Sequence, residues 1–241
     1  MSASPDAGTA RRALALVDLT RLERPDAAEA IDALAARAVT DAGRVAAICV
    51  YPEWVERVLG PGVPVAAVAN FPLGADDPDL AVADAGQAVE AGAAEVDVVV
   101  PWQAFMAGTP DAIDRTVRAV RHAIGPDVGL KAILETGLLP GAMVPDAGRR
   151  ALAAGADFLK TSSGKVGPGA SPEAVEALLE VVREAGHGGV KASGGIRTAE
   201  QAADYIALAD RVMGAGWATP ERFRIGASSL VDDLLARLGE G

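Results

Sequence analysis

The chain has 241 residues and a net charge of −11, and half of its residues are hydrophobic. This length fits one large α/β domain or two small ones, and the negative charge argues against general binding to nucleic acids or membrane surfaces. A single cysteine, Cys49, excludes an intrachain disulfide.

The N-terminal stretch has no apolar segment typical of a signal peptide, and no apolar run reaches the ~18 residues of a membrane span. We therefore expect a cytoplasmic protein with no membrane partner. The chain has two histidines, His122 and His187, beside its one cysteine. A catalytic zinc site usually takes three protein ligands, largely histidine or cysteine, so we predict no metal site, although counting does not exclude magnesium on carboxylates.

Apolar runs alternate with helix-start signals along the whole chain. The expected strands are residues 14–19, 45–50, 63–69, 95–100, 128–134, 158–160, 190–192 and 224–226. After a polar stretch, residues 1–12, the expected helices cover about 26–41, 52–59, 79–91, 111–124, 145–154, 172–185, 199–213 and 227–238. Helix starts are marked by Ser171-Pro172 and by a capping box from Thr198 to Gln201.

Eight strand–helix units without a break in composition predict one domain over residues 1–241, an α/β fold with a single (β/α)8 TIM barrel. The strands are continuous apolar runs, as expected where both faces of a parallel sheet are covered. An open doubly wound sheet is the alternative. It lacks its usual GxGxxG motif after the first strand.

Two similar stretches, ADFLKTSSGKVGPG at 156–169 and GVKASGGIRT at 189–198, each place a lysine before a glycine-rich loop. In adjacent parallel strands Lys160 and Lys191 would lie ~4.8 Å apart. Repulsion between the two ammonium groups and desolvation both favour a neutral amine, which is the nucleophile of Schiff-base chemistry. The alternative is two strand-end lysines that reach into solvent.

Other polar residues are expected at the same end of the barrel. Asp97 lies inside an apolar strand and needs a cationic partner, which the lysines supply. Lys131 lies deeper in its strand and could either react or only support the charge. Asp18 and Thr20 follow the first strand. The alternative for Asp97 is a buried salt bridge without a catalytic task.

An anion site is predicted where the seventh and eighth strands end, because barrels often hold phosphate there. Gly194-Gly195 and Ser228-Ser229 both precede helices whose N-termini favour negative charge. Lys165 adds a positive charge. Ordinary helix caps are the alternative.

These stretches together resemble the 2-deoxyribose-5-phosphate aldolase family of Schiff-base (class I) aldolases, which fold as TIM barrels. The matching stretches are LVDLTRL (16–22), AAICVYP (46–52), EVDVVVPWQAFMAG (95–108), LKAILETG (130–137), GADFLKTSSGKV (155–166), VKASGGIRTAEQA (190–202) and RIGASSL (224–230). Two departures are Leu19, where many relatives carry His, and Trp102, where some carry Tyr.

The resemblance implies a Schiff base on Lys160, a proton relay of Asp97 and Lys191, and no metal or organic cofactor. The implied phosphate contacts are Lys165, Gly194, Gly195, Ser228 and Ser229. The implied partners are small molecules, a phosphorylated sugar and acetaldehyde, and a homodimer or higher homo-oligomer is compatible with them. Two other hypotheses remain open: a transaldolase-like or ketose-phosphate aldolase, and a phosphate-binding barrel without catalysis.

Overall fold

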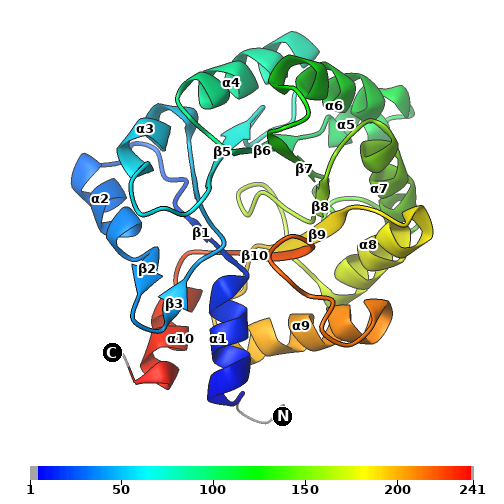
Figure 1. Cartoon of the computed structure of the whole chain (residues 1–241). Coiled ribbons are helices and arrows are strands. Elements are labelled where there is room, and N and C mark those ends of the chain that lie inside the picture. Colours follow the sequence, from blue (N-terminus) through cyan, green and yellow to red (C-terminus); the bar gives the residue numbers. More distant parts are fainter. Residues whose placement is uncertain (1–4, 240–241) are drawn as a thin grey trace.

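Eight parallel strands close into a barrel, and helices surround it (Figure 1). The structure is a computed structural model that describes residues 5–239, so residues 1–4 of the expected polar N-terminal stretch lie outside it. The barrel strands are β1 (Val17–Thr20), β4 (Ala47–Val50), β5 (Val65–Ala69), β6 (Glu95–Val99), β7 (Gly129–Ile133), β8 (Phe158–Lys160), β9 (Gly189–Ser193) and β10 (Phe223–Ala227). β1 pairs with both β10 and β4, which closes the sheet. The predicted TIM barrel is confirmed, and the open sheet is wrong.

The helices pack outside the strands, as expected for a barrel whose strands are buried on both faces. They are α1 (Ala7–Ala15), α2 (Ala28–Ala36), α3 (Val55–Val58), α4 (Pro78–Glu90), α5 (Trp102–Met106), α6 (Asp111–Ile124), α7 (Val144–Ala153), α8 (Pro172–Ala185), α9 (Ala199–Met213) and α10 (Leu230–Leu238), with 3-10 turns at Pro52–Trp54 and Gly141–Met143. In the part of the chain that the structure describes, none is both long and apolar enough to cross a membrane.

The predicted helix starts after β8 and β9 are confirmed. Ser171 accepts a hydrogen bond from the backbone N–H of Ala174 at 3.2 Å, with Pro172 in the first turn of α8. Thr198 and Gln201 form the reciprocal capping box that begins α9. Because side chains satisfy the free N–H groups of both helices, each helix starts immediately after its strand-end loop.

Several boundaries differ from the sequence expectation. The first strand begins at Val17 and not at residue 14, because Leu14 lies buried in α1. The first expected helix, over about 26–41, ends at Ala36, and the chain then forms a small antiparallel hairpin, β2 (Val39–Thr40) and β3 (Gly43–Arg44). The last helix begins at Leu230 and not at residue 227.

The late start of α10 follows from the length of β10. Ala227 continues the ladder and pairs with Leu19 of β1. Apolar periodicity alone could not separate these last strand residues from the helix, because short apolar runs fit both structures. Ser228 and Ser229 therefore form the turn between strand and helix.

The strand register sets the depth of each charged residue in the barrel. Lys160 pairs with Lys191 across β8 and β9, and Asp97 pairs with Lys131 across β6 and β7. Lys160 ends its strand, as the sequence predicted. Lys191 was also expected at a strand end, but it lies in the middle of β9. Both lysines are buried.

Helices α7 and α8 pack closely on the outer face of β8. A Cβ atom added at Gly148 would lie 3.1 Å from Cδ1 of Leu159 and 3.3 Å from Cδ2 of Leu178. Both leucines are fully buried. Leu178 therefore fills a site with little free space, and its truncation would leave a cavity.

We expect Leu178→Ala to lower the free energy of unfolding by about 2–5 kcal/mol, the usual cost of removing a buried leucine side chain. Urea unfolding followed by circular dichroism measures this change. Leu80→Ala is the matched control, because Leu80 also lies in a helix but is 45% exposed. It should change stability by no more than about 0.5 kcal/mol. Equal losses would mean that Leu178 contributes no more than a surface leucine.

Candidate active site

Lys160, Asp97 and Lys191 meet inside the barrel. Nζ of Lys160 lies 2.8 Å from Oδ2 of Asp97, and Nζ of Lys191 lies 2.7 Å from the same oxygen. All three side chains are at most 3% exposed. The strands β6, β8 and β9 thus bring one carboxylate oxygen into contact with two amines.

Lys131 occupies the other oxygen of Asp97. Its Nζ lies 2.8 Å from Oδ1 of Asp97 and also contacts Oε2 of Glu95. Nζ of Lys131 lies 3.7 Å from Asp18. Lys131 is therefore held by carboxylates on several sides, which fits the charge-supporting alternative for this residue.

Asp18 and Arg224 extend these ion pairs to β1 and β10. Asp18 lies 2.5 Å from Nζ of Lys191 and 2.7 Å from Arg224. Arg224 also reaches Glu95 at 2.9 Å and lies over the ring of Phe158, with its guanidinium carbon 5.6 Å from the ring centroid. We call Asp18, Glu95, Asp97, Lys131, Lys160, Lys191 and Arg224 the charged cluster.

The charged cluster separates the protonation states of its lysines. Burial opposes charge on Lys191 and Lys131, but the carboxylates around them hold both pKa values above the ordinary lysine value. Burial lowers the pKa of Lys160, Asp97 counteracts this in part, and Lys191 lowers it further. Burial would raise the pKa of Asp97, but the lysines hold it well below its usual range.

Charge balance agrees with these directions. With Lys160 neutral, the carboxylates of Asp18, Glu95 and Asp97 match the cations of Lys131, Lys191 and Arg224 one for one. A protonated Lys160 would add an unmatched positive charge to a buried group, which a low-dielectric interior disfavours. Lys160 is therefore the amine that can act as a nucleophile, whereas Lys191 and Asp97 remain charged.

A cavity of about 320 Å³ opens above Lys160. It is lined by Thr20, Leu22, Glu23, Lys160, Ser163, Gly164, Lys165, Ser193, Gly194, Gly195, Arg197, Gly226, Ala227 and Ser228. The loops after β1, β8, β9 and β10 supply these residues, so the cavity lies at the carboxyl ends of the strands. Its volume suits a small molecule better than a macromolecule.

The predicted site residues divide into two groups. Thr20, Lys160, Lys165, Gly194, Gly195 and Ser228 line the cavity, and Asp18, Asp97, Lys131 and Lys191 lie in the buried charged cluster. Ser229 is absent from the cavity lining and is the residue before α10. Lys160 is the member of the charged cluster that also lines the cavity.

Sequence analysis missed Glu95, Arg224 and Glu135. Glu95 and Arg224 lie near the beginning of their strands, where the sequence gives no sign that they face the barrel interior. Glu135 is fully buried at a positive φ of 52°. Its Oε1 accepts a hydrogen bond from the N–H of Ser163 at 2.6 Å, and Oγ of Ser163 accepts one from the N–H of Lys165 at 3.1 Å. A strained backbone thus holds the start of the loop that carries Lys165.

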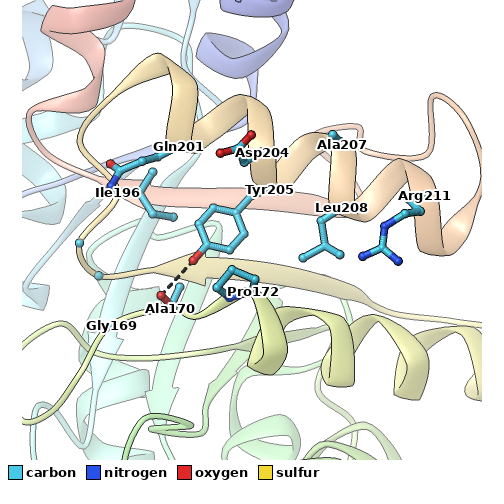
Figure 2. A pocket seen from close by; sticks show the side chains of 12 residues that line it. Gly169, Ala170, Pro172, Ile196, Gln201, Asp204, Tyr205, Ala207, Leu208 and Arg211 are labelled. Atoms are coloured by element: carbon cyan, nitrogen blue, oxygen red, sulfur yellow. Dashed lines mark hydrogen bonds between the residues drawn. The ribbon is translucent and has the colours of Figure 1, made fainter. Parts of the chain in front are cut away.

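The end of that loop rests directly on the turn after β9. A Cβ atom at Gly169 would lie 2.1 Å from the carbonyl oxygen of Gly194, so only glycine permits this approach. The N–H of Ala170 donates to the carbonyl of Ser193 at 2.9 Å, and the hydroxyl of Tyr205 donates to the carbonyl of Ala170 at 2.9 Å (Figure 2). The loops after β8 and β9 therefore form one unit.

A larger groove of about 620 Å³ lies behind this contact, between α8 and α9 (Figure 2). Pro172, Ile196, Tyr205 and Leu208 form much of its wall. We assign the active site to the smaller cavity, because that cavity contains Lys160. The two hollows share the Gly194-Gly195 turn.

Within residues 5–239, no group of three or more His, Cys, Asp or Glu side chains is arranged to hold a metal ion. The carboxylates of the charged cluster are paired with lysine and arginine instead. Cys49 is buried, its Sγ lies 3.9 Å from Oδ2 of Asp97, and burial raises the pKa of its thiol. Cys49 is thus a neutral neighbour of the charged cluster.

Solved structures of similar fold cover nearly the whole chain. An apo structure from Toxoplasma gondii ME49, assigned to deoxyribose-phosphate aldolase, is 25% identical with a TM-score of 0.89 and covers 98% of this chain and 97% of its own. One from Coccidioides immitis with the same assignment is 32% identical, with a TM-score of 0.81, and the match covers 96% and 88%. The tetrameric deoxyribose phosphate aldolase from Aeropyrum pernix is 27% identical, with a TM-score of 0.78 and coverage of 96% and 93%.

The sequence model described as DeoC/LacD family aldolase matches residues 12–235, which include all eight barrel strands and the charged cluster. The chain therefore belongs to the DeoC/LacD family of aldolases and is a carbon–carbon lyase.

Proposed function

We propose that this aldolase reversibly cleaves 2-deoxy-D-ribose 5-phosphate to D-glyceraldehyde 3-phosphate and acetaldehyde, through a Schiff base on Lys160, in the breakdown of deoxyribose phosphates. The observation that carries the proposal is the position of Lys160. Its amine has a lowered pKa, lies 2.8 Å from Asp97 and faces a cavity that two glycine-rich loops border. The names of the solved relatives in the family support the same substrate.

The reaction begins when the neutral amine of Lys160 adds to the aldehyde carbon of the open-chain sugar. With one proton taken up from solvent, loss of water leaves a protonated imine with the positive charge at the former Nζ, and the final hydrolysis returns that proton. Asp97 contacts Nζ at 2.8 Å, so its carboxylate stabilises that charge as it forms. The protonated imine then acts as the acceptor of electrons for the bond cleavage.

Cleavage requires a base for the C3 hydroxyl. Asp97 and Lys191 lie 2.7 Å apart, and a water molecule between this pair and the C3 hydroxyl can carry the proton from the substrate to the carboxylate of Asp97. As the hydroxyl loses its proton, the C2–C3 bond breaks and its electron pair moves to the imine, which becomes an enamine. Glyceraldehyde 3-phosphate leaves. The enamine takes a proton at C2, and hydrolysis of the imine releases acetaldehyde and restores Lys160.

The phosphate of the substrate is assigned to the loops after β8, β9 and β10. Gly194 and Gly195 expose backbone to the cavity, Ser228 borders it, and Lys165 supplies positive charge. These groups come from strand-end loops, whereas the charged cluster lies buried inside the barrel and reaches the cavity through Lys160. A sugar phosphate would therefore have to be long enough to contact both the loops and Lys160.

Two alternatives are separated by simple assays. A transaldolase-like or ketose-phosphate aldolase would release product from a ketose phosphate, whereas the proposed enzyme releases glyceraldehyde 3-phosphate from 2-deoxyribose 5-phosphate, measured with a coupled dehydrogenase. A phosphate-binding barrel without catalysis would release product from neither. The lowered pKa of Lys160 and its contact with Asp97 favour catalysis.

Sodium borohydride with acetaldehyde should leave an ethyl group on Lys160, because reduction fixes the Schiff base as a secondary amine. Peptide mass spectrometry locates the group. The same treatment of Lys160→Met, which keeps the chain length of the side chain, should give no labelled peptide. Labelling of Lys131, Lys165 or Lys191 in the wild-type protein would contradict the assignment.

Lys191→Met should move the pH profile of this trapping to higher pH. A lysine whose pKa is lowered becomes a neutral nucleophile at lower pH, and removal of the Lys191 cation returns the pKa of Lys160 toward its ordinary value. We also expect kcat to fall by about 10²-fold or more through loss of proton transfer. Buried Asp18 loses one partner, so the free energy of unfolding should fall by about 3 kcal/mol.

Arg211→Met is the control for Lys191→Met. It removes the same charge from an exposed position on α9, so the trapping profile should not move. If the Lys191→Met profile is unchanged as well, Lys191 does not set the protonation of Lys160.

Ser228→Asp should raise the KM for 2-deoxyribose 5-phosphate at least tenfold, since a carboxylate beside a phosphate in a partly enclosed cavity costs about 1–3 kcal/mol. The KM for unphosphorylated 2-deoxyribose should change little. Ser229→Asp tests the second serine, which precedes α10 and does not line the cavity. Equal losses for both sugars would place the phosphate elsewhere.

A further inference from the structure

Among the described residues that line the cavity of Lys160, Glu23 is the one with an acidic side chain. It lies in the loop after β1, and its Oε1 is 3.1 Å from Nζ of Lys165. Lys165 comes from the loop after β8, so this ion pair crosses the cavity mouth. A carboxylate at this place repels a phosphate and holds one of the cations that a phosphate needs.

The net charge at the mouth of the cavity depends on the Glu23–Lys165 ion pair. Lys165 and Arg197 are the cations that line the outer cavity. Lys160 below them has a lowered pKa and adds little charge, and the chain as a whole is strongly acidic. With Glu23 bound to Lys165, about one positive charge is left for an anion. Glu23 therefore decides how strongly the cavity attracts a phosphate.

We propose that Glu23 is a specificity-determining residue that competes with the phosphate of the substrate for Lys165. This inference rests on the proposed function. In the empty site Glu23 holds Lys165, and the phosphate displaces it on binding. The competition weakens the binding of phosphorylated sugars and leaves the binding of unphosphorylated sugars unchanged. It therefore reduces the preference of the enzyme for phosphorylated over unphosphorylated sugars.

The exposure of the pair sets the size of the effect. The side chain of Glu23 is 62% exposed and that of Lys165 is 32% exposed. Ion pairs at such positions are weak because water and salt screen them. Loss of the competing carboxylate should therefore strengthen phosphate binding by about two- to fivefold and no more.

The test is Glu23→Gln, which keeps the shape of the side chain and removes its charge. We expect the KM for 2-deoxyribose 5-phosphate to fall about two- to fivefold, with kcat and the KM for unphosphorylated 2-deoxyribose unchanged. Glu53→Gln is the matched control. Glu53 pairs with Arg24 at 2.9 Å and is also exposed, but it does not line the cavity, so its variant should match the wild type. An unchanged or higher KM in Glu23→Gln, or the same fall in both variants, would overturn the proposal.

The double variant tests whether Glu23 acts through Lys165. In Lys165→Met the cation is absent, so Glu23→Gln should lower the KM for the phosphorylated sugar less than it does in the wild type. A full effect in that background would mean that Glu23 does not act through Lys165.

Phosphate binding can be measured without any turnover. Calorimetric titration with sn-glycerol 3-phosphate should show tighter binding to Glu23→Gln by the same factor. If the wild type fails to cleave 2-deoxyribose 5-phosphate, the proposed reaction is wrong, and this titration alone then decides whether Glu23 competes for Lys165. If both proteins bind sn-glycerol 3-phosphate equally, the role of Glu23 is wrong whatever the reaction.

Discussion

The carboxylate of Asp97 is the contact on which the active site depends. One of its oxygens binds Lys160 at 2.8 Å and Lys191 at 2.7 Å, and the other binds Lys131 at 2.8 Å. Three lysines around one buried carboxylate would repel each other if all were protonated. The barrel resolves this because Asp18 and Glu95 supply further negative charge on the far side of Lys131 and Lys191. Lys160 forms its ion pair with Asp97, and burial and the neighbouring Lys191 lower its pKa, whereas the pKa values of Lys131 and Lys191 are raised.

This arrangement is expensive for stability and useful for chemistry. Apolar residues of the same volume would often stabilise a barrel interior more than buried ion pairs do. The charged cluster, however, lowers the pKa of Lys160 and holds its amine against Asp97 before any substrate binds. In the proposed mechanism, little reorganisation would be needed when the positive charge of an imine develops, since rigid strands already orient these groups. On that proposal, the buried ion pairs that reduce stability would also lower the barrier of the reaction.

The side of the cavity that we propose for the phosphate is built differently, from loops whose positions are fixed by hydrogen bonds and close backbone contacts. Gly169 touches Gly194, and Glu135 and Tyr205 bind the two ends of the loop that carries Lys165. This loop therefore has a fixed position, although it has no regular secondary structure. The charged cluster and the anion site are thus held independently, one by strands and one by loop contacts, and they meet at Lys160.

The sequence alone determined the number and order of the strand–helix units, because apolar runs, helix caps and glycine-rich turns are local features. It also identified Lys160, Lys191 and Asp97, since charged residues in apolar strands are rare without a task. Tertiary structure alone decided that Arg224 pairs with Asp18, more than 200 residues away, and that the pKa of Lys160 is lowered while that of Lys191 is raised. Those outcomes depend on barrel closure and strand register, because the charge on a buried group is set by neighbours that only the folded chain brings within a few ångströms.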